Sequence, residues 1–402
     1  MVVRTERTAV VIGAGIGGLT AALALHRRGW RVTVLDRVPR LEPVGAGIGL
    51  APNAVKALDT LGMADWLDGA AVIQGSGGVR RPDGSWLLRT DLGRVAERFG
   101  RPLLVVPRPE LVDALVERLP AGALVPGAAA TEVEPGSADQ PAVVRTRDAE
   151  FIADVVVAAD VVVAADGIKS LVRTALFPRH PGPVYAGFTA WRMIVRVPQG
   201  VQISPSETWG SGAVFGIVPL SGGRLYCYAT ANVPSGTAYW DVKAMLTSNF
   251  ADWHEPIPTL IRATPPEALL RNDIWSLEQP LTEYHSGRVA LLGDAARAMT
   301  PNLGQGGCQA IEDAVVLAHR LGGDLGVSEV PSALAAYTAD RRNRTARIAR
   351  QSARAGRMQQ LDSPMRIAVR NKLISLVGRL GPRLMLRQLA PLASWEPPSS
   401  HL

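Results

Sequence analysis

A glycine-rich turn near the N-terminus constrains the fold more than any other feature of this chain. Gly13, Gly15 and Gly18 follow an apolar run at 9–12, and residues 19–28 have helical spacing of apolar positions. In such a strand, turn and helix, the first glycine permits a tight turn, the second lets a pyrophosphate approach the backbone, and the third lets the helix pack closely. Free N–H groups at the helix N-terminus favour the phosphates. The turn therefore predicts a Rossmann-like dinucleotide-binding unit.

The next predicted strand, at 31–35, ends in an acidic residue. Asp36 lies 18 residues after Gly18, where a carboxylate accepts a hydrogen bond from an adenosine ribose and disfavours a 2′-phosphate. We therefore expect a resident nucleotide other than NADP. Ala14 within the turn and Arg37 beside Asp36 are further candidate cofactor-binding residues. The turn alone does not distinguish FAD from NAD.

Two further segments repeat the pattern of a strand that leads into a polar loop. Residues 161–173 (VVVAADGIKSLVR) predict a buried strand, a turn at Asp166, and a helix that starts at Ser170. Residues 288–296 (RVALLGDAA) predict a strand that ends at Asp294, followed by a glycine-rich loop and a helix over about 308–320. Both segments predict pockets that tolerate an anionic ligand.

The three segments, in this order and spacing, resemble the fingerprints of the single-component aromatic-ring hydroxylases, the class A FAD-dependent monooxygenases similar to p-hydroxybenzoate hydroxylase. The resemblance spans almost the whole chain. It implies an α/β fold in which a Rossmann-like FAD-binding domain of the glutathione-reductase type is interleaved with a β-sheet substrate domain, with helices at the C-terminus.

The resemblance also implies roles for individual residues. Asp294 would bind the flavin ribityl chain, and Asp166 would support FAD and transient nicotinamide binding. Arg108 falls where the family carries an arginine that reaches the FAD, and Asn53 matches a segment beside the flavin. The loop expected against the isoalloxazine contains Pro301, Gly304, Gly306 and Gly307.

Two positions depart from the family pattern. Arg297 stands where the family usually has histidine. The six-residue segment DVVVAA occurs at 154–159 and again at 160–165. One copy suffices for a strand, so we expect the second copy to lengthen that strand or to loop out.

The segment 183–278 differs from its surroundings. Its alternating strand-like runs are separated by Gly, Pro and Ser, which predicts a β-rich layer over the flavin. A hairpin from 74–105 is expected to join this layer. The predicted FAD-binding domain therefore comprises 1–73, 106–182 and 279–330, the substrate domain comprises 74–105 and 183–278, and 331–402 forms a helical segment.

Arg192 is the candidate catalytic residue. It lies in a stretch that in similar proteins can face the substrate cavity, where a guanidinium orients an anionic or phenolic group. The alternative is a strand residue paired at the domain interface.

The reaction implied by the resemblance is hydroxylation of an aromatic, polycyclic or conjugated small molecule. NADH or NADPH docks transiently and reduces FAD, and O2 adds at C4a to give a hydroperoxide that transfers OH. Epoxidation, Baeyer–Villiger oxidation and dehydrogenation on the same scaffold remain alternatives, because fold does not fix chemistry. A non-catalytic flavin-binding protein is the alternative from another class.

The charge of the chain is confined to its C-terminal part. Residues 346–402 hold ten Arg and Lys against two acidic residues, which gives this part a net charge of +8. The total is +7, so residues 1–345 carry a net charge of −1. The nearly neutral remainder argues against a nucleic-acid partner. We expect Arg344, Arg347, Arg350, Arg354 and Arg357 to form a solvated helix face, and the apolar face of 365–389 to pack on the body. Contact with an anionic membrane is the alternative.

Cysteine and histidine usage indicates neither a disulfide framework nor a metal site. The chain has two cysteines and six histidines, without metal-ligand spacing. We expect Cys308 to behave as a small hydrophobic residue in the core. We also expect the protein to be located in the cytoplasm. The sequence does not specify the substrate or the oligomeric state.

Overall fold

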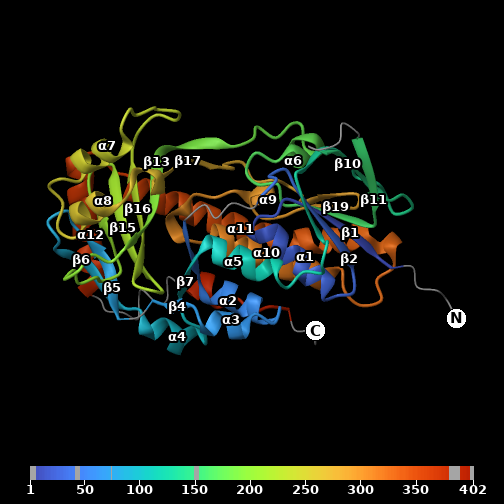
Figure 1. The fold of residues 1–402 in the computed structure, drawn as a ribbon, viewed down its shortest axis with the longest axis horizontal. Coiled ribbons are helices and arrows are strands. Elements are labelled where there is room, and N and C mark those ends of the chain that lie inside the picture. Colours follow the sequence, from blue (N-terminus) through green and yellow to red (C-terminus); the bar gives the residue numbers. More distant parts are fainter. Residues whose placement is uncertain (1–5, 41–45, 74, 149–153, 380–389, 399–402) are drawn as a thin grey trace.

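The computed structural model describes residues 6–40, 46–73, 75–148, 154–379 and 390–398. Two large sheets lie side by side along the long axis of the molecule (Figure 1). The described helices are α1 (Ile16–His26), α2 (Pro52–Asp59), α3 (Ala64–Asp68), α4 (Gly93–Phe99), α5 (Arg108–Val116), α6 (Leu171–Leu176), α7 (Val242–Asn249), α8 (Ile257–Ala263), α9 (Asp294–Arg297), α10 (Gly306–Arg320), α11 (Val330–Gln359) and α12 (Pro364–Arg379). Three 3₁₀ turns, η1 (Pro266–Ala268), η2 (Pro301–Leu303) and η3 (Val327–Glu329), complete the set.

The first large sheet has six strands and is built around the N-terminal strand. Its order is β18 (His285–Ser286), β19 (Val289–Leu291), β12 (Val161–Ala164), β1 (Thr8–Ile12), β2 (Arg31–Asp36) and β8 (Leu124–Pro126). All neighbours pair in parallel except β18 with β19. The strands predicted at 9–12, 31–35, 161–165 and 288–292 are therefore confirmed, with shifts at their ends.

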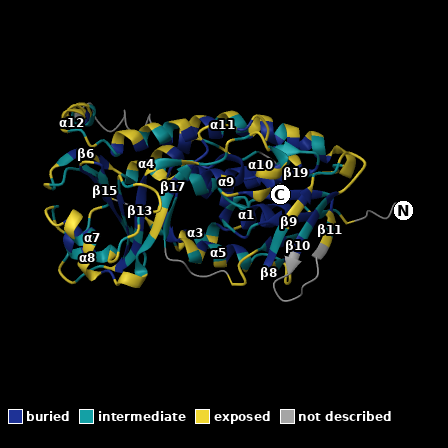
Figure 2. Ribbon diagram, turned by 90° about the horizontal axis from the view of Figure 1, so that it is seen from above, coloured by how far each residue is buried: buried dark blue, intermediate teal, exposed yellow. Residues whose placement is uncertain are grey.

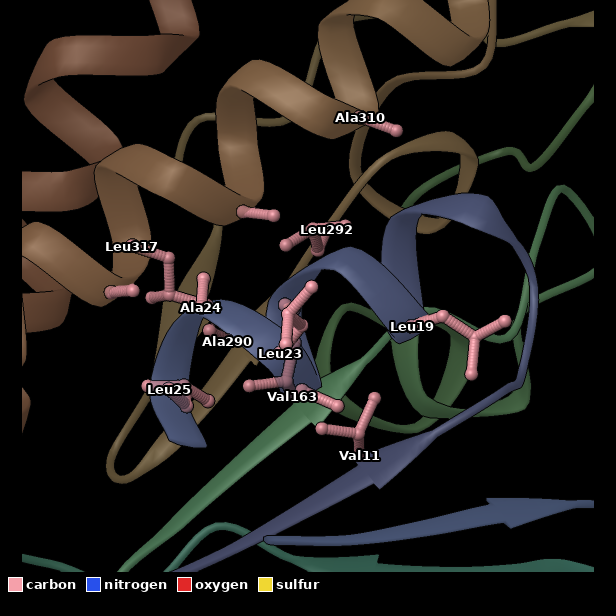
Figure 3. Close-up of a cluster of buried hydrophobic side chains, with 14 of the residues drawn as sticks. Val11, Leu19, Leu23, Ala24, Leu25, Val163, Ala290, Leu292, Ala310 and Leu317 are labelled. Atoms are coloured by element: carbon pink, nitrogen blue, oxygen red, sulfur yellow. The ribbon is translucent and has the colours of Figure 1, made fainter. Parts of the chain in front are cut away.

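Helices α1 and α10 pack together against one face of this sheet (Figure 3). Leu23 on α1, Leu292 after β19 and Leu317 on α10 are 1 % exposed or less. Gly17 permits the close approach, since a Cβ atom there would lie 2.8 Å from Leu292 Cδ2. The apolar residues of α1 are thus buried on two sides, against the sheet and against α10.

The duplicated segment forms two strands in two different sheets. The first copy is β11 (Asp154–Ala159), which pairs antiparallel with β10 (Ala142–Asp148), itself paired with β9 (Ala128–Glu134). The second copy supplies β12 of the six-stranded sheet. Asp160 separates them, and its Oδ2 accepts bonds of 2.9 Å from both the N–H and the hydroxyl of Thr8. The expectation of a lengthened strand or a loop was wrong, because each copy finds its own pairing partners.

The second large sheet has seven strands. Its order is β17 (Leu270–Ser276), β13 (Val184–Arg196), β16 (Arg224–Ala231), β15 (Ala213–Leu220), β14 (Ser206–Trp209), β5 (Ser76–Arg80) and β6 (Trp86–Asp91). The β5–β6 hairpin joins through a parallel pairing of β5 with β14. One face of the sheet is apolar, with Trp191, Phe215 and Cys227 buried beneath α7 and α8.

A small sheet lies between the two large ones. It consists of β3 (Gly47–Leu50), β7 (Leu104–Pro107) and β4 (Ala71–Val72). Val105 on β7 packs with Leu220 and Tyr226 of the seven-stranded sheet. This contact joins the small sheet to the seven-stranded sheet.

Helix α11 connects the two large sheets over 30 residues, with a buried inner face and an exposed outer face (Figure 2). Tyr337 Oη donates to the carbonyl oxygen of Leu291 at 3.1 Å, and Gln360 at the other end donates to Thr230 Oγ1 on β16 at 2.6 Å. Of the five arginines expected on a solvated face, only Arg344 departs: it turns inward to Glu312 at 2.8 Å, and the other four are exposed.

Helix α12 differs from the expectation that its apolar face packs on the body. Met365, Val369, Leu373 and Leu376 are 55–76 % exposed, whereas Arg370 is buried over the ring of Trp209. Arg370 faces the body in place of these apolar residues. Its Nη1 donates to the carbonyl oxygens of Met358 and Gln359 at the end of α11, each at 3.3 Å. Residues 380–389 lie outside the described residues. Among those described, no helix is long and apolar enough to span a membrane.

Candidate functional site

The three motifs found in the sequence lie at one edge of the six-stranded sheet. Strands β1, β12 and β19 are parallel neighbours, so their carboxyl ends meet. Gly13 follows β1, Asp166 follows β12, and Asp294 follows β19. Ligands of open parallel sheets bind at this edge.

The N-terminal turn requires glycine at two of its positions and is open at a third. Gly13 has a φ of +104°, and a Cβ atom there would lie 2.4 Å from the carbonyl oxygen of Ala165. A Cβ atom at Gly18 would lie 1.9 Å from the carbonyl oxygen of Gly13. Gly15, at the N-cap of α1, has no atom within 4 Å of the Cβ position. The turn thus leaves open space at a helix N-terminus, which suits a phosphate.

Asp36 stabilises this turn directly. Its Oδ2 accepts a hydrogen bond of 2.6 Å from the N–H of Ala14, and its Oδ1 accepts one of 2.9 Å from the N–H of Val38. The neighbouring Arg37 is exposed. Contact of Asp36 with an adenosine ribose remains a prediction.

A buried arginine links the second and third motifs. Arg173 on α6 is 2 % exposed and donates to the carbonyl oxygens of Ala295 at 3.1 Å and Ile168 at 2.7 Å. Burial lowers the pKa of Arg173, and the charges of Asp166 and Asp294 act against that shift. Oδ2 of Asp166 accepts from the N–H of Val172 at 3.3 Å, whereas its buried Oδ1 has no partner among the described residues.

Asp294 is the first residue of α9, at the carboxyl end of β19. Its side chain has an exposed surface, yet protein surrounds it closely enough that burial raises its pKa to about 6. The charges of Arg108 and Arg173 oppose this rise. Arg108 reaches this place from the start of α5, where its N–H donates to the carbonyl oxygen of Ala46 at 2.8 Å.

The glycine-rich loop lies beside β3. Gly304 has a φ of +61°, and both it and Gly306 have open space at the Cβ position. A Cβ atom at Gly307 would lie 2.7 Å from Ile48 Cδ1 on β3. Cys308 fastens the two segments together, because its Sγ donates to the carbonyl oxygen of Gly49 at 3.4 Å. Pro301 is exposed at the other end of the loop.

A buried polar network supports this loop from below. Arg341 on α11 bonds to Glu312 and Asp313 on α10, and Asp313 Oδ2 accepts from the N–H of Gly293 at 3.3 Å. Asn53 on α2 donates to Gln305 of the loop at 3.2 Å and to Glu312 at 2.5 Å.

The two carboxylates of this network respond differently to burial. Burial raises the pKa of Glu312, but the charges of Arg341 and Arg344 outweigh it and leave the pKa below its ordinary value. The pKa of Asp313 stays raised by burial, despite Arg341.

Arg192 lies on the seven-stranded sheet, half-buried. Its guanidinium bonds to the side-chain oxygen of Asn272 on the neighbouring β17, a partner that sequence reasoning did not name. Burial raises the pKa of Tyr226, and the nearby Arg192 opposes the rise. Tyr226 also touches β3, since a Cβ atom at Gly47 would lie 2.5 Å from its ring. Arg192 is thus close to the contact between this sheet and the loops around β3.

Arg297, which departs from the family pattern, is buried beside the third motif. It donates to the carbonyl oxygen of Leu277 at 2.6 Å, and its Nε has no partner among the described residues. Burial lowers its pKa. No group of His, Cys, Asp and Glu able to hold a metal occurs in the part of the chain that the structure describes.

Comparison with known proteins identifies the family. A sequence model described as an FAD binding domain matches residues 6–352. The aurachin C monooxygenase/isomerase of Stigmatella aurantiaca is 39% identical over 380 residues, which are 93% of this chain and 95% of that protein. An FAD-dependent urate hydroxylase of Klebsiella pneumoniae is 34% identical over 322 residues, 77% of this chain and 80% of the relative. The structure of Klebsiella pneumoniae HpxO with FAD and uric acid is similar with a TM-score of 0.86 and 27% identity, covering 97% of this chain and 99% of that one.

The structure groups the predicted residues into three neighbouring sets: the first turn with Asp36, the pair Asp166 and Asp294 with Arg108, and the loop that follows Pro301. Sequence reasoning missed Arg173, Arg341, and Glu207 and Tyr228 on the seven-stranded sheet. The sequence signal for Arg173 was its position six residues after Gly167, in the turn that begins at Asp166.

Proposed function

Because this chain belongs to the family of FAD-dependent aromatic-ring monooxygenases, we propose that it uses NADH or NADPH and O2 to hydroxylate a small aromatic or conjugated molecule. The observation that carries the proposal is the convergence of three motifs on one sheet edge that faces a second, β-rich layer. This arrangement suits a flavin enzyme. The cofactor supplies the reactivity, and the protein on either side of it positions the substrate and shields it from water.

The residues at the sheet edge fit FAD. The open space at Gly15 suits the pyrophosphate, and Asp36 lies where an adenosine ribose would follow. The desolvated Asp294 is suited to accept hydrogen bonds from ribityl hydroxyls, and the orphaned Oδ1 of Asp166 offers a further acceptor. Gly304 and Gly306 leave room for a flat ring against the loop.

When bound, FAD supplies the redox chemistry, taking a hydride from the nicotinamide and activating O2. The chain's own residues then bind and orient the reactants. Arg108 and Arg173 provide positive charge around Asp294. Val105, Leu220 and Tyr226 form an apolar contact that excludes water on one side.

The first test is the visible spectrum of the purified protein, followed by oxidation of NADH and NADPH in the presence of phenols and polycyclic aromatics. We expect bound FAD, substrate-stimulated turnover and a product that gains one oxygen atom, with peroxide measured alongside. The product distinguishes hydroxylation from epoxidation and Baeyer–Villiger oxidation. A protein that cannot be reconstituted with FAD would overturn the proposal.

A further inference from the structure

Four residues form a row across four strands of the seven-stranded sheet. Arg192 on β13 is opposite Tyr228 on β16, Tyr228 is opposite Gly216 on β15, and Gly216 is opposite Glu207 on β14. Cross-strand partners point to the same face of a sheet. The sequence neighbours Trp191, Phe215 and Cys227 are buried on the opposite face, beneath α7 and α8. The row therefore lies on the face turned away from those helices.

This face of the sheet is directed toward the loops of the flavin site. Tyr226, two residues before Tyr228 on the same face, packs on Gly47 of β3. Gln359 at the end of α11 reaches Glu207 Oε2 at 3.4 Å. Gln359 Oε1 in turn accepts from Asn302 Nδ2 at 2.6 Å, and Asn302 belongs to the loop that follows Pro301. Two side chains thus connect Glu207 to the loop proposed to lie against the flavin.

Gly216 allows Tyr228 to cross its strand. A Cβ atom at Gly216 would lie 2.1 Å from Tyr228 Cζ, so the ring occupies the space that a side chain would take. The hydroxyl of Tyr228 then donates to Glu207 Oε1. The absence of a side chain on β15 is therefore what brings the tyrosine and the carboxylate together.

The second oxygen of Glu207 accepts from donors as well. Trp209 Nε1 donates to Oε2 at 2.8 Å, and an indole nitrogen is only ever a donor. Together with Gln359 and Tyr228, three donors converge on one carboxylate. Glu207 serves here as an acceptor at both oxygens, and the proton of the Tyr228 hydroxyl is committed to it. The remaining lone pairs of the Tyr228 oxygen can only accept.

We propose that Glu207 is a positioning residue that fixes Tyr228 as a hydrogen-bond acceptor, so that the site selects aromatic rings carrying an N–H or O–H donor. The inference rests on the proposed function and narrows its substrate class. Glu207, Tyr228 and Arg192 are all half-buried, so the row keeps surface that a ligand can contact. A ring without the donor leaves the Tyr228 oxygen unpaired when it displaces water, which is the kind of mismatch that polar sites reject strongly.

The test compares matched ligands on the holoenzyme. We would titrate 4(1H)-quinolone against 1-methyl-4-quinolone, and 2-naphthol against 2-methoxynaphthalene, by calorimetry and by the perturbation of the flavin spectrum. The native protein is expected to bind each donor at least about tenfold more tightly than its methylated partner, the range that an unpaired buried group costs. Equal binding of both partners overturns the proposal, and so does binding of neither.

Glu207→Gln tests the polarity of the arrangement. Trp209 can only donate, so the amide oxygen must face Trp209 and the amide NH2 must face Tyr228. Tyr228 then accepts from the amide and turns its own proton toward the ligand. The preference for the donor is expected to vanish or reverse in this variant, and to vanish in Tyr228→Phe. A merely structural role would weaken both partners equally and leave their ratio unchanged, an outcome that overturns the proposal.

Tyr185→Phe is the matched control. Tyr185 also lies in the seven-stranded sheet, but its hydroxyl donates to the backbone carbonyl of Val233 at 2.5 Å. This variant is expected to keep the native ligand ratio. Bound FAD and the uncoupled oxidation of NADH or NADPH, recorded on the same samples, test the proposed function separately. A flavin-loaded, reducible protein without ligand discrimination refutes only the role of Glu207.

Discussion

Arg341 and Glu312 form a fully buried ion pair beneath the glycine-rich loop at 301–307, with Arg341 Nη1 2.6 Å from Glu312 Oε2 and side chains 1 % and 0 % exposed. The pair connects α11 to α10, whose first turn begins at the glycine-rich loop. Asp313 accepts from the same arginine and from the N–H of Gly293. The guanidinium of Arg341 therefore binds α10 directly and, through Asp313, supports the backbone at Gly293 in the third motif.

Replacing Arg341 is expected to be severely destabilising. In Arg341→Met, Asp313 loses its cation and Arg344 is the one cation left beside Glu312, so buried charge is left poorly compensated. Breaking a buried pair from one side costs about 3–5 kcal/mol. The free energy of unfolding in urea, measured on the holoenzyme, checks this magnitude.

The control for Arg341 joins the same two helices at the surface. Arg320 on α10 pairs with Asp340 on α11 at 2.7 Å, with side chains 40% and 36% exposed. Arg320→Met is expected to cost less than about 1 kcal/mol, because exposed pairs contribute little. Equal costs for the two variants would show that burial of the Arg341 pair is not what matters.

Gly18→Ala should abolish or weaken FAD binding. The added Cβ would lie 1.9 Å from the carbonyl oxygen of Gly13, so the turn proposed to bind the phosphates must shift. We expect FAD affinity to fall by at least about tenfold, or 1.4 kcal/mol, measured by flavin fluorescence during reconstitution.

The matched glycine for Gly18 is Gly69, which has an ordinary φ of −80° and room for a Cβ. Gly69→Ala is expected to bind FAD like the native protein. Undiminished FAD binding by Gly18→Ala would contradict the proposed place of the pyrophosphate.

The local structure around the three motifs was largely predictable, because its signals act within a few residues. The first turn needs glycine for reasons that act within a few residues, and Ser170 caps α6 as expected, accepting from the N–H of Arg173. The two copies of DVVVAA show the limit of such signals. Identical segments adopt different sheets because their partners lie elsewhere in the chain, and sequence periodicity does not identify those partners.

The row on the seven-stranded sheet could not be predicted for the same reason. Glu207 and Tyr228 meet only through the registers of β14, β15 and β16, and through the missing side chain of Gly216. Arg341 finds its carboxylates 28 and 29 residues away. Buried charged residues carry no apolar periodicity, so the sequence marks them as surface residues until their partners are known.

Both cysteines should be unreactive in the folded protein, as the sequence led us to expect for Cys308. Burial raises the pKa of the Cys308 thiol to about 12, so at pH 8 about one molecule in ten thousand carries the reactive thiolate. Ellman's reagent is expected to react slowly with the native protein and to titrate two thiols in guanidinium chloride. Rapid reaction of one native thiol is assigned with Cys308→Ser and Cys227→Ser. If Cys308 reacts, the packing of β3 on α10 is contradicted; if Cys227 reacts, the packing of α7 and α8 on the seven-stranded sheet is contradicted.

Asp294 is expected to make the stability of the flavin-free protein depend on pH. Its pKa is raised from 3.8 to about 6, so the fold favours the protonated acid. The resulting stabilisation is present below pH 3.8 and is lost as pH rises through about 6. Asp294→Asn cannot ionise, and without FAD it should therefore unfold at a higher temperature than the native protein at pH 8, by a margin that shrinks at pH 5. With FAD the order at pH 8 should reverse, because the ribityl hydroxyls lose a charged acceptor. Thermal unfolding with and without FAD measures both effects, and Asp113→Asn, at an exposed position on α5, controls for the loss of one negative charge. An advantage of Asp294→Asn that is equal at both pH values would refute the raised pKa of Asp294.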